Sequence, residues 1–210
     1  MMYDAQHIFI NGESYRAAGR DATLMRRLAD ERQLTARELA RAGRHVCVHF
    51  VGDAARLPPD AAAAYQACRT TRADFCPEIP AGDFSLVVDA LFGIGLARPI
   101  TGDLAALIAR INAFAGPVLA LDIPSGLDGD SGRVLGTAVR ATHTLSFIGG
   151  KPGLYTLDGP DHCGEIHVDD LGLPLAGLPG ALLSTADFRV GLRPRPRNCH
   201  KGSHGSLAVI

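Results

Sequence analysis

Two aspartates lie where short apolar strands are expected to end, and their positions suggest shared chemistry. Asp89 closes the run SLVVD and Asp122 closes VLALD, with one helix-length segment between them. A right-handed strand–helix–strand crossover brings the carboxyl ends of both parallel strands to one edge of the sheet, where ligands bind. A strand-end aspartate can also simply cap the following turn. Because a glycine-bearing loop follows each of these two, we expect a shared site.

The two loops carry groups suited to an anion and to a cation. In the second loop, Ser125 offers hydroxyl and carbonyl oxygens beside Asp122, and hard oxygen ligands suit a cation. Ser125 lacks the G-x-S-x-G elbow of a hydrolase nucleophile, which disfavours a serine hydrolase. Glycines of the first loop would let backbone N–H groups approach an anion, and its arginine would add a guanidinium for phosphate. The residues of that first loop are Gly93, Ile94, Gly95, Leu96, Ala97, Arg98 and Pro99.

A lysine between glycines is the third candidate. Lys151, in GGKPG, follows an expected strand and either faces an anionic substrate or is a solvated turn residue. The absence of GxxxxGK[ST] rules out a P-loop. Four histidines in strand-like segments are expected to be packed or at the surface rather than catalytic: His45, His49, His143 and His167.

The elements that must position these residues alternate along the chain. The patterns predict helices over 22–42, 59–69 and 103–116, and strands over 45–51, 86–89, 118–122, 138–147 and 164–172. The first twenty residues show no firm pattern. Strands alternating with helices of this length predict βαβ units, and therefore an α/β fold with a mostly parallel sheet covered on both faces.

Composition narrows the class of protein. The 210 residues are 47% hydrophobic and 20% charged, which is typical of a globular chain and not of a disordered one. Lys and Arg number 21 against 22 Asp and Glu, so a non-specific nucleic-acid binder is disfavoured. Without an apolar run of about 18 residues or a signal-like start, we expect a cytoplasmic protein that does not enter a membrane.

The five cysteines are scattered and include no CxxC pair, so we expect free thiols. Cys199, His200 and His204 lie close together, but they are a poor match to a four-ligand zinc site.

Four segments carry a family resemblance. VVDALFGIGLARPITG, VLALDIPSGLDGDSGRVLG, ATHT and GGKPGL, in this order and spacing, resemble the YjeF N-terminal domain of the NAD(P)H-hydrate epimerase family, from about Glu38 to about Leu173. The resemblance implies a Rossmann-like three-layer α/β/α sandwich. It also implies interconversion of the R and S epimers of hydrated NADH or NADPH, NAD(P)HX, so that an ADP-dependent dehydratase specific for one epimer restores the cofactor. A potassium ion near the dinucleotide is part of the family pattern.

Motif by motif, the resemblance assigns roles. Asp89 and Ser125 match the cation ligands, the loop from Gly93 to Pro99 matches the one that holds the substrate's phosphates, and Asp122 matches a substrate-contacting aspartate. Inverting a hydroxyl-bearing carbon requires proton transfer, so we expect Asp122 to be the acid/base group and Lys151 to stabilise charge.

One departure from the family pattern concerns a Gly-Asn-Asn-Gly-Gly-Asp-Gly loop. It is expected near Arg26–Arg32, where RRLADER stands, and the residues before it lack the expected hydrophobic first strand. Two alternatives to an active epimerase therefore stay open. One is a catalytically impaired remnant that binds a nucleotide weakly or serves as an interaction module. The other is a different Rossmann-like nucleotide binder.

The resemblance also divides the chain. Residues 1–37 form a divergent N-terminal segment, and 38–191 form an incomplete epimerase domain. Residues 192–210 resemble the linker and first strand of an ADP-dependent dehydratase domain, which would be truncated. The expected partners are the small-molecule substrate and a functionally coupled dehydratase domain, with a homo-oligomer possible and no nucleic acid or membrane.

Overall fold

The computed structural model describes residues 6–11, 36–57, 59–79, 84–171, 182–184 and 187. The chain divides into a unit from Met1 to Pro174, which holds all the helices and strands named below, and a second unit from Leu175 to Ile210. Within the described ranges, no helix combines the length and apolar character that a bilayer crossing requires.

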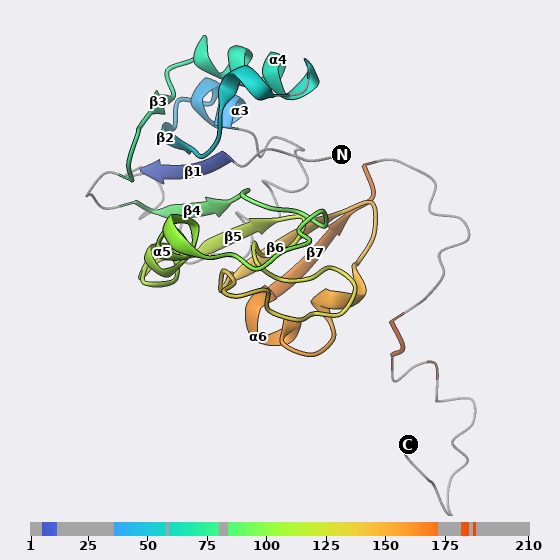
Figure 1. Cartoon of the computed structure of the whole chain (residues 1–210). Coiled ribbons are helices and arrows are strands. Elements are labelled where there is room, and N and C mark those ends of the chain that lie inside the picture. Colours follow the sequence, from blue (N-terminus) through green and yellow to red (C-terminus); the bar gives the residue numbers. More distant parts are fainter. Residues whose placement is uncertain are drawn as a thin grey trace, which may run out of the picture. The chain divides into compact units, whose positions relative to one another are not determined.

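The described strands form one sheet in the order β3-β2-β1-β4-β5-β6-β7 (Figure 1). Strand β1 pairs antiparallel with β2 and β4, whereas β2–β3, β4–β5, β5–β6 and β6–β7 are parallel. The predicted α/β class with a mostly parallel sheet is therefore confirmed. The strands are β1 Gln6–Asn11, β2 His45–Phe50, β3 Asp74–Phe75, β4 Leu86–Asp89, β5 Val118–Leu121, β6 His143–Phe147 and β7 Glu165–Asp169.

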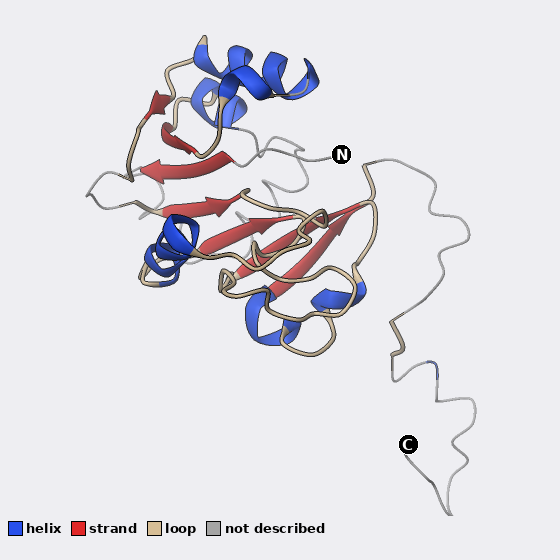
Figure 2. Cartoon of the chain, in the orientation of Figure 1, coloured by secondary structure: helices blue, strands red, loops and turns tan. Residues whose placement is uncertain are grey.

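Helices cover both faces of the sheet (Figures 1 and 2). On one face, α3 (Ala36–Arg41) and α4 (Pro59–Arg69) contribute to a core that also includes Val88 and Leu145. On the other face, α5 (Gly102–Asn112) packs its apolar stripe into a core with Val87. The short helix α6 (Gly159–Cys163) and the 3₁₀ turn η2 (Pro152–Leu154) lie together in a third cluster, and a second 3₁₀ turn, η1, spans Ala54–Arg56.

Side-chain direction alternates along each strand, so neighbouring residues point to opposite faces. In β6, Leu145 belongs to the α3-side core, whereas the hydroxyl of Thr144 donates to the carbonyl of Cys163 in α6. Polar groups on β6 can thus be assigned to the α3 side or to the α5–α6 side.

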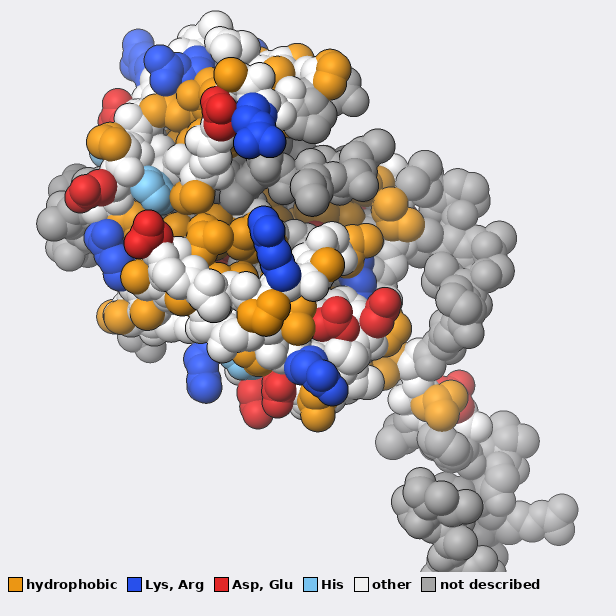
Figure 3. All heavy atoms as spheres, viewed as in Figure 1, with side chains coloured by type: hydrophobic (Ala, Val, Ile, Leu, Met, Phe, Trp, Pro, Cys, Tyr) orange, Lys and Arg blue, Asp and Glu red, His pale blue; other side chains and the backbone are white. Residues whose placement is uncertain are grey.

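Charged side chains of both signs are interspersed over the described part of the face drawn in Figure 3. This distribution agrees with the balanced charge of the whole chain, −1 at pH 7.

Three sequence-based expectations need correction or limitation. The first twenty residues were expected to lack a strand, and this is wrong, because β1 pairs with β2 along its whole length. Its short apolar stretch, Ile8–Ile10, is too brief to show a period, and its hydrogen bonds come from neighbours that are distant in sequence. Strand β6 begins at His143 rather than at 138, because the preceding backbone is bonded to loops: Val139 N donates to Ser125 O.

The predicted helix over 22–42 is confirmed only for Ala36–Arg41, and Gly43, at φ +79°, follows its end as expected. The segment Arg26–Arg32 and residues 192–210, on which the loop and dehydratase expectations rest, lie outside the described residues.

Candidate active site

The site begins at the buried end of β4. Asp89 pairs with Ala120 of the parallel strand β5, which places the two strand ends side by side as predicted. Its side chain is fully buried. The carboxylate accepts hydrogen bonds from Ser125 N at 2.8 Å, Ser125 Oγ at 2.7 Å and Leu91 N at 3.3 Å. Burial raises the pKa of Asp89, and the hydrogen bonds from Ser125 act in the opposite direction.

Ser125 links Asp89 to the loop that follows β4. Its Oγ donates to Asp89, accepts from Phe92 N at 2.9 Å and lies 3.4 Å from Phe92 O. The hydroxyl is buried and both donates and accepts a hydrogen bond, which agrees with the prediction that it is not a nucleophile. The next residue, Gly126, has φ +97°, and a Cβ there would lie 1.9 Å from the carbonyl of Thr137, so only glycine fits.

Oxygen atoms dominate this end of β4. The Asp89 carboxylate and the Phe92 carbonyl both lie within hydrogen-bond range of the Ser125 hydroxyl, at 2.7 and 3.4 Å. A carboxylate has about four lone-pair sites, so three accepted hydrogen bonds leave capacity for a further partner. Hard oxygen donors with one net negative charge fit an alkali cation, so these residues are compatible with the expected potassium ion.

Asp122 is held in an unusual backbone conformation directly after β5. Its φ is +71°, and Ile123 N donates to Leu121 O at 2.9 Å, which together describe a γ-turn. Asp122 N donates to Leu145 O at 2.7 Å, so the turn is anchored to β6. A non-glycine residue with positive φ costs about 1–3 kcal/mol and persists only where the surrounding structure enforces it. Such strain is typical of functional sites.

The same kind of turn closes β6. Ile148 has φ +68°, and Gly149 N donates to Phe147 O at 2.7 Å. The turn redirects the chain so that Lys151 reaches back toward the strand ends. The predicted strand-end loop around Lys151 is therefore present.

Lys151 and Asp122 form an ion pair in which the lysine ammonium donates to Asp122 Oδ1. The ammonium also donates to Ser146 Oγ at 2.9 Å and to Phe147 O at 2.8 Å, which uses all three of its N–H donors. The side chains are only 16% and 24% exposed for lysine and aspartate, respectively, so the pair is largely shielded from water. Lys151 is thus held in place by three hydrogen bonds and is not a solvated turn lysine.

The loop from Gly93 to Pro99 lies against Asp122. A Cβ added to Gly93 would stand 3.1 Å from Asp122 Oδ2, whereas one added to Gly95 would meet no atom within 4 Å. The loop backbone therefore passes next to the carboxylate and then opens to solvent. Two of its residues, Gly93 and Leu96, are half-buried, and the remaining five are exposed: Ile94, Gly95, Ala97, Arg98 and Pro99.

The structure brings most of the predicted residues together around the short segment Phe92–Gly93. Phe92 is bonded to Ser125, which in turn holds Asp89, and the next residue, Gly93, lies beside Asp122. Two contributors were missed by the sequence interpretation. Ser146 anchors the lysine, and the only signal for it was a small polar residue inside the apolar strand HTLSF. The carbonyl of Phe92 is a backbone group and leaves no sequence signal.

Comparison with known proteins gives a family match. The model of the YjeF-related protein N-terminus matches residues 34–153. The chain is 44% identical over 144 residues to the NAD(P)H-hydrate epimerase of Bordetella bronchiseptica, an alignment that covers 67% of this chain and 63% of that protein. It is 38% identical over 199 residues to the bifunctional NAD(P)H-hydrate repair enzyme Nnr of Coxiella burnetii, covering 91% of this chain and 39% of that protein. A third relative, the enzyme of the same name from Escherichia coli, is 40% identical over 129 residues, which is 60% of this chain and 25% of that protein. The chain thus spans less than two thirds of the length of these relatives.

Proposed function

The chain belongs to the YjeF-related N-terminal family, and we propose that it interconverts the R and S epimers of hydrated NADH and NADPH. The observation that carries this proposal is the Lys151–Asp122 ion pair at the carboxyl edge of the sheet, beside the Gly93 loop. An intact, strained and largely buried pair of this kind favours a working site over an inactive remnant.

Asp122 is the acid/base group in this proposal. The hydroxyl-bearing carbon is also bonded to the ring nitrogen, so its inversion balances if that carbon–nitrogen bond breaks with its electron pair going to nitrogen while the hydroxyl loses its proton and becomes a carbonyl. Closure of the ring on the other face of the carbonyl re-forms the bond and returns the proton to oxygen. The Asp122 carboxylate accepts that proton and gives it back. Its Oδ1 is bonded to Lys151, and its Oδ2 faces the backbone of Gly93. Lys151 fixes the carboxylate and stabilises negative charge that develops during proton transfer.

The loop from Gly93 to Pro99 receives the phosphates of the dinucleotide. Its exposed backbone at Gly95 allows close approach, and Arg98 supplies a positive charge at the exposed part of the loop. Because the Gly93 backbone lies beside the Asp122 carboxylate, phosphates bound along this loop would hold the nicotinamide ring within reach of that carboxylate.

Asp89 and Ser125 would hold a potassium ion, with the Phe92 carbonyl as a further oxygen ligand. A bound cation would offset the charge of the Asp89 carboxylate, which is costly to bury. Ser125 and the Phe92–Gly93 backbone connect this ion site to the substrate loop.

We further propose that residues 38–191 form the epimerase domain and that its product is passed to an ADP-dependent dehydratase activity. The two relatives described as bifunctional repair enzymes support this coupling.

The four described cysteines, Cys47, Cys68, Cys76 and Cys163, are free thiols, which supports a reducing compartment such as the cytoplasm.

The test is an epimerisation assay. One purified epimer of hydrated NADH is incubated with the protein, and the appearance of the other is followed by chromatography. We expect interconversion well above the spontaneous rate, faster in potassium than in a buffer whose only cation is bulky and organic. A rate equal to the spontaneous one would contradict the proposal and favour the remnant. Equal rates with and without potassium would remove the role given to Asp89 and Ser125.

A further inference from the structure

A second polar cluster lies on the α3-side face of the sheet. His143 is the first residue of β6, and Glu165 and His167 lie two positions apart on β7. In the parallel register His143 is opposite Glu165, so all three side chains share one face. This is the face of Leu145, opposite the Ser146 hydroxyl of β6 that is bonded to Lys151 in the proposed active site.

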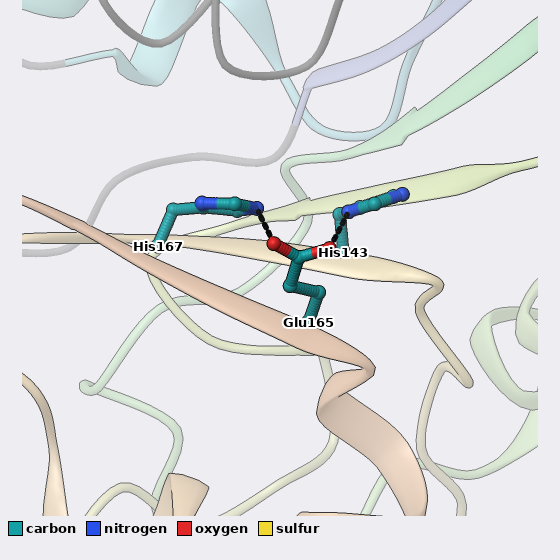
Figure 4. Close-up of side chains that lie close together, drawn as sticks. All are labelled: His143, Glu165 and His167. Atoms are coloured by element: carbon teal, nitrogen blue, oxygen red, sulfur yellow. Dashed lines mark ion pairs between the residues drawn. The ribbon is translucent and has the colours of Figure 1, made fainter. Parts of the chain in front are cut away.

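Glu165 lies between the two imidazole rings, as Figure 4 shows. Its Oε2 is 3.9 Å from His143 Nδ1, and its Oε1 is 3.5 Å from His167 Nε2. The rings stack with centroids 5.9 Å apart and planes inclined by 23°. One nitrogen from each ring is thus directed at the same carboxylate.

These two nitrogens, His143 Nδ1 and His167 Nε2, are the buried side-chain nitrogen or oxygen atoms in the described part of the chain that have no hydrogen-bond partner. Leaving a buried polar atom unpaired is energetically costly, and most folded proteins avoid it. Two such atoms facing one carboxylate therefore call for a missing partner that both can contact.

We propose that His143, Glu165 and His167 bind a divalent transition-metal ion, with zinc as the best match. Two imidazole nitrogens and one carboxylate oxygen make a three-ligand set that zinc uses where a fourth position stays open to another ligand. The three candidate ligand atoms lie within 4.8 Å of one another.

The spacing fits an ion after a small adjustment. Zinc bonds of about 2.0–2.2 Å place tetrahedral ligand atoms about 3.3–3.5 Å apart. The 3.5 Å contact, to Oε1, already has this spacing, and the 3.9 Å contact, to Oε2, is longer by a few tenths of an ångström. The three ligand atoms lie within 4.8 Å of one another, so closing the set on one ion requires side-chain movement on the order of 1 Å. The Glu165 side chain is 45% exposed and can rotate to close the set.

The test uses Zn²⁺ and Co²⁺ on the full chain after chelator treatment and removal of any affinity tag. We expect one equivalent of Zn²⁺ to bind and to raise the Tm, and one equivalent of Co²⁺ to give the visible absorption of a four- or five-coordinate site. His143→Gln, Glu165→Gln and His167→Gln should each weaken Zn²⁺ binding by at least about 100-fold, because a lost ligand costs more than a lost supporting contact.

Two controls separate this site from other histidines. His45 also pairs with a carboxylate, at 2.9 Å from Asp74, but it is exposed, so His45→Gln should bind Zn²⁺ as the parent does. A triple variant, Cys199→Ser with His200→Gln and His204→Gln, should also retain binding. Far-UV circular dichroism of each variant establishes whether it is folded. If a histidine variant is unfolded, the conservative Glu165→Gln variant tests the loss of Zn²⁺ binding in its place.

The proposal is overturned if no equivalent of Zn²⁺ binds, if binding survives all three cluster changes, or if the triple variant abolishes it. Epimerase activity plays no part in this readout, so the metal site and the proposed function succeed or fail independently.

Discussion

The carboxyl edge of β4–β6 and the His143–Glu165–His167 cluster both place polar groups on the same sheet, yet they are built differently. At the carboxyl edge, Asp89, Ser125 and Lys151 each have at least two hydrogen-bond partners within the chain. At the histidine cluster on the opposite face, two buried ring nitrogens have none.

This difference separates a site whose side chains are held by hydrogen bonds within the chain from one whose two ring nitrogens have no such partner. Satisfied donors and two γ-turns hold Asp122 and Lys151 in place, as preorganised proton-transfer chemistry requires. The stacked imidazoles gain their missing partner only when something binds. Changes at the carboxyl edge should therefore damage activity or stability, whereas changes in the cluster should spare activity and, in metal-free protein, stability.

The largest effect is expected at the lysine. Lys151→Met leaves Asp122 without its ammonium partner and should lower the epimerisation rate by about 100- to 10,000-fold. Lys151→Arg keeps the charge but not the three-donor geometry and should recover part of the rate. In the other region, His167→Gln should epimerise at the parent rate. A strong loss of epimerisation rate in His167→Gln together with a normal rate in Lys151→Met would mean that the histidine cluster, and not the carboxyl edge, carries the activity.

A smaller effect is expected on the free energy of unfolding when Ser125 is changed. Ser125→Ala leaves Phe92 N and the Asp89 carboxylate short of partners and should lower the free energy of unfolding by about 1–3 kcal/mol. In chelator-treated protein, His167→Leu removes a nitrogen that has no partner, so it should change that energy by less than about 1 kcal/mol. Urea denaturation of the two variants checks the contrast, and equal losses would contradict it.

The smallest effect is expected within the phosphate loop. Gly93→Ala presses a methyl group to 3.1 Å from Asp122 Oδ2, whereas Gly95→Ala projects into open space. Misplacing the carboxylate by a few tenths of an ångström should lower kcat by about tenfold in Gly93→Ala. Gly95→Ala should instead raise KM, because it obstructs the approach of phosphate. Identical kinetic changes in both would mean that the loop does not position Asp122.

Sequence patterns predicted the regular part of this molecule well. β4, α5 and β5 follow their apolar patterns to within a few residues, and parallel pairing then places Asp89 next to the strand that leads to Asp122. The helix α6 was missed because five residues containing glycine and proline, GPDHC, show no period. β1 was missed because its pairing comes from strands distant in sequence.

Contacts between side chains were harder to predict than helices and strands. The sequence does not predict the ion pair between Lys151 and Asp122, because the γ-turns at Asp122 and Ile148 depend on positive φ at non-glycine residues. It predicts His143 and His167 only as packed or surface residues. Their common carboxylate appears only once the β6–β7 register is known.

The most direct test of the account is the epimerisation rate of Asp122→Asn beside that of Asp130→Asn. Asp130 is an exposed aspartate in a neighbouring turn and controls for the change of charge. Asparagine keeps the shape of Asp122 but cannot exchange the proton, so the rate should fall by about 100- to 10,000-fold while Asp130→Asn matches the parent. A folded Asp122→Asn protein that epimerises hydrated NADH at the parent rate would contradict the central claim.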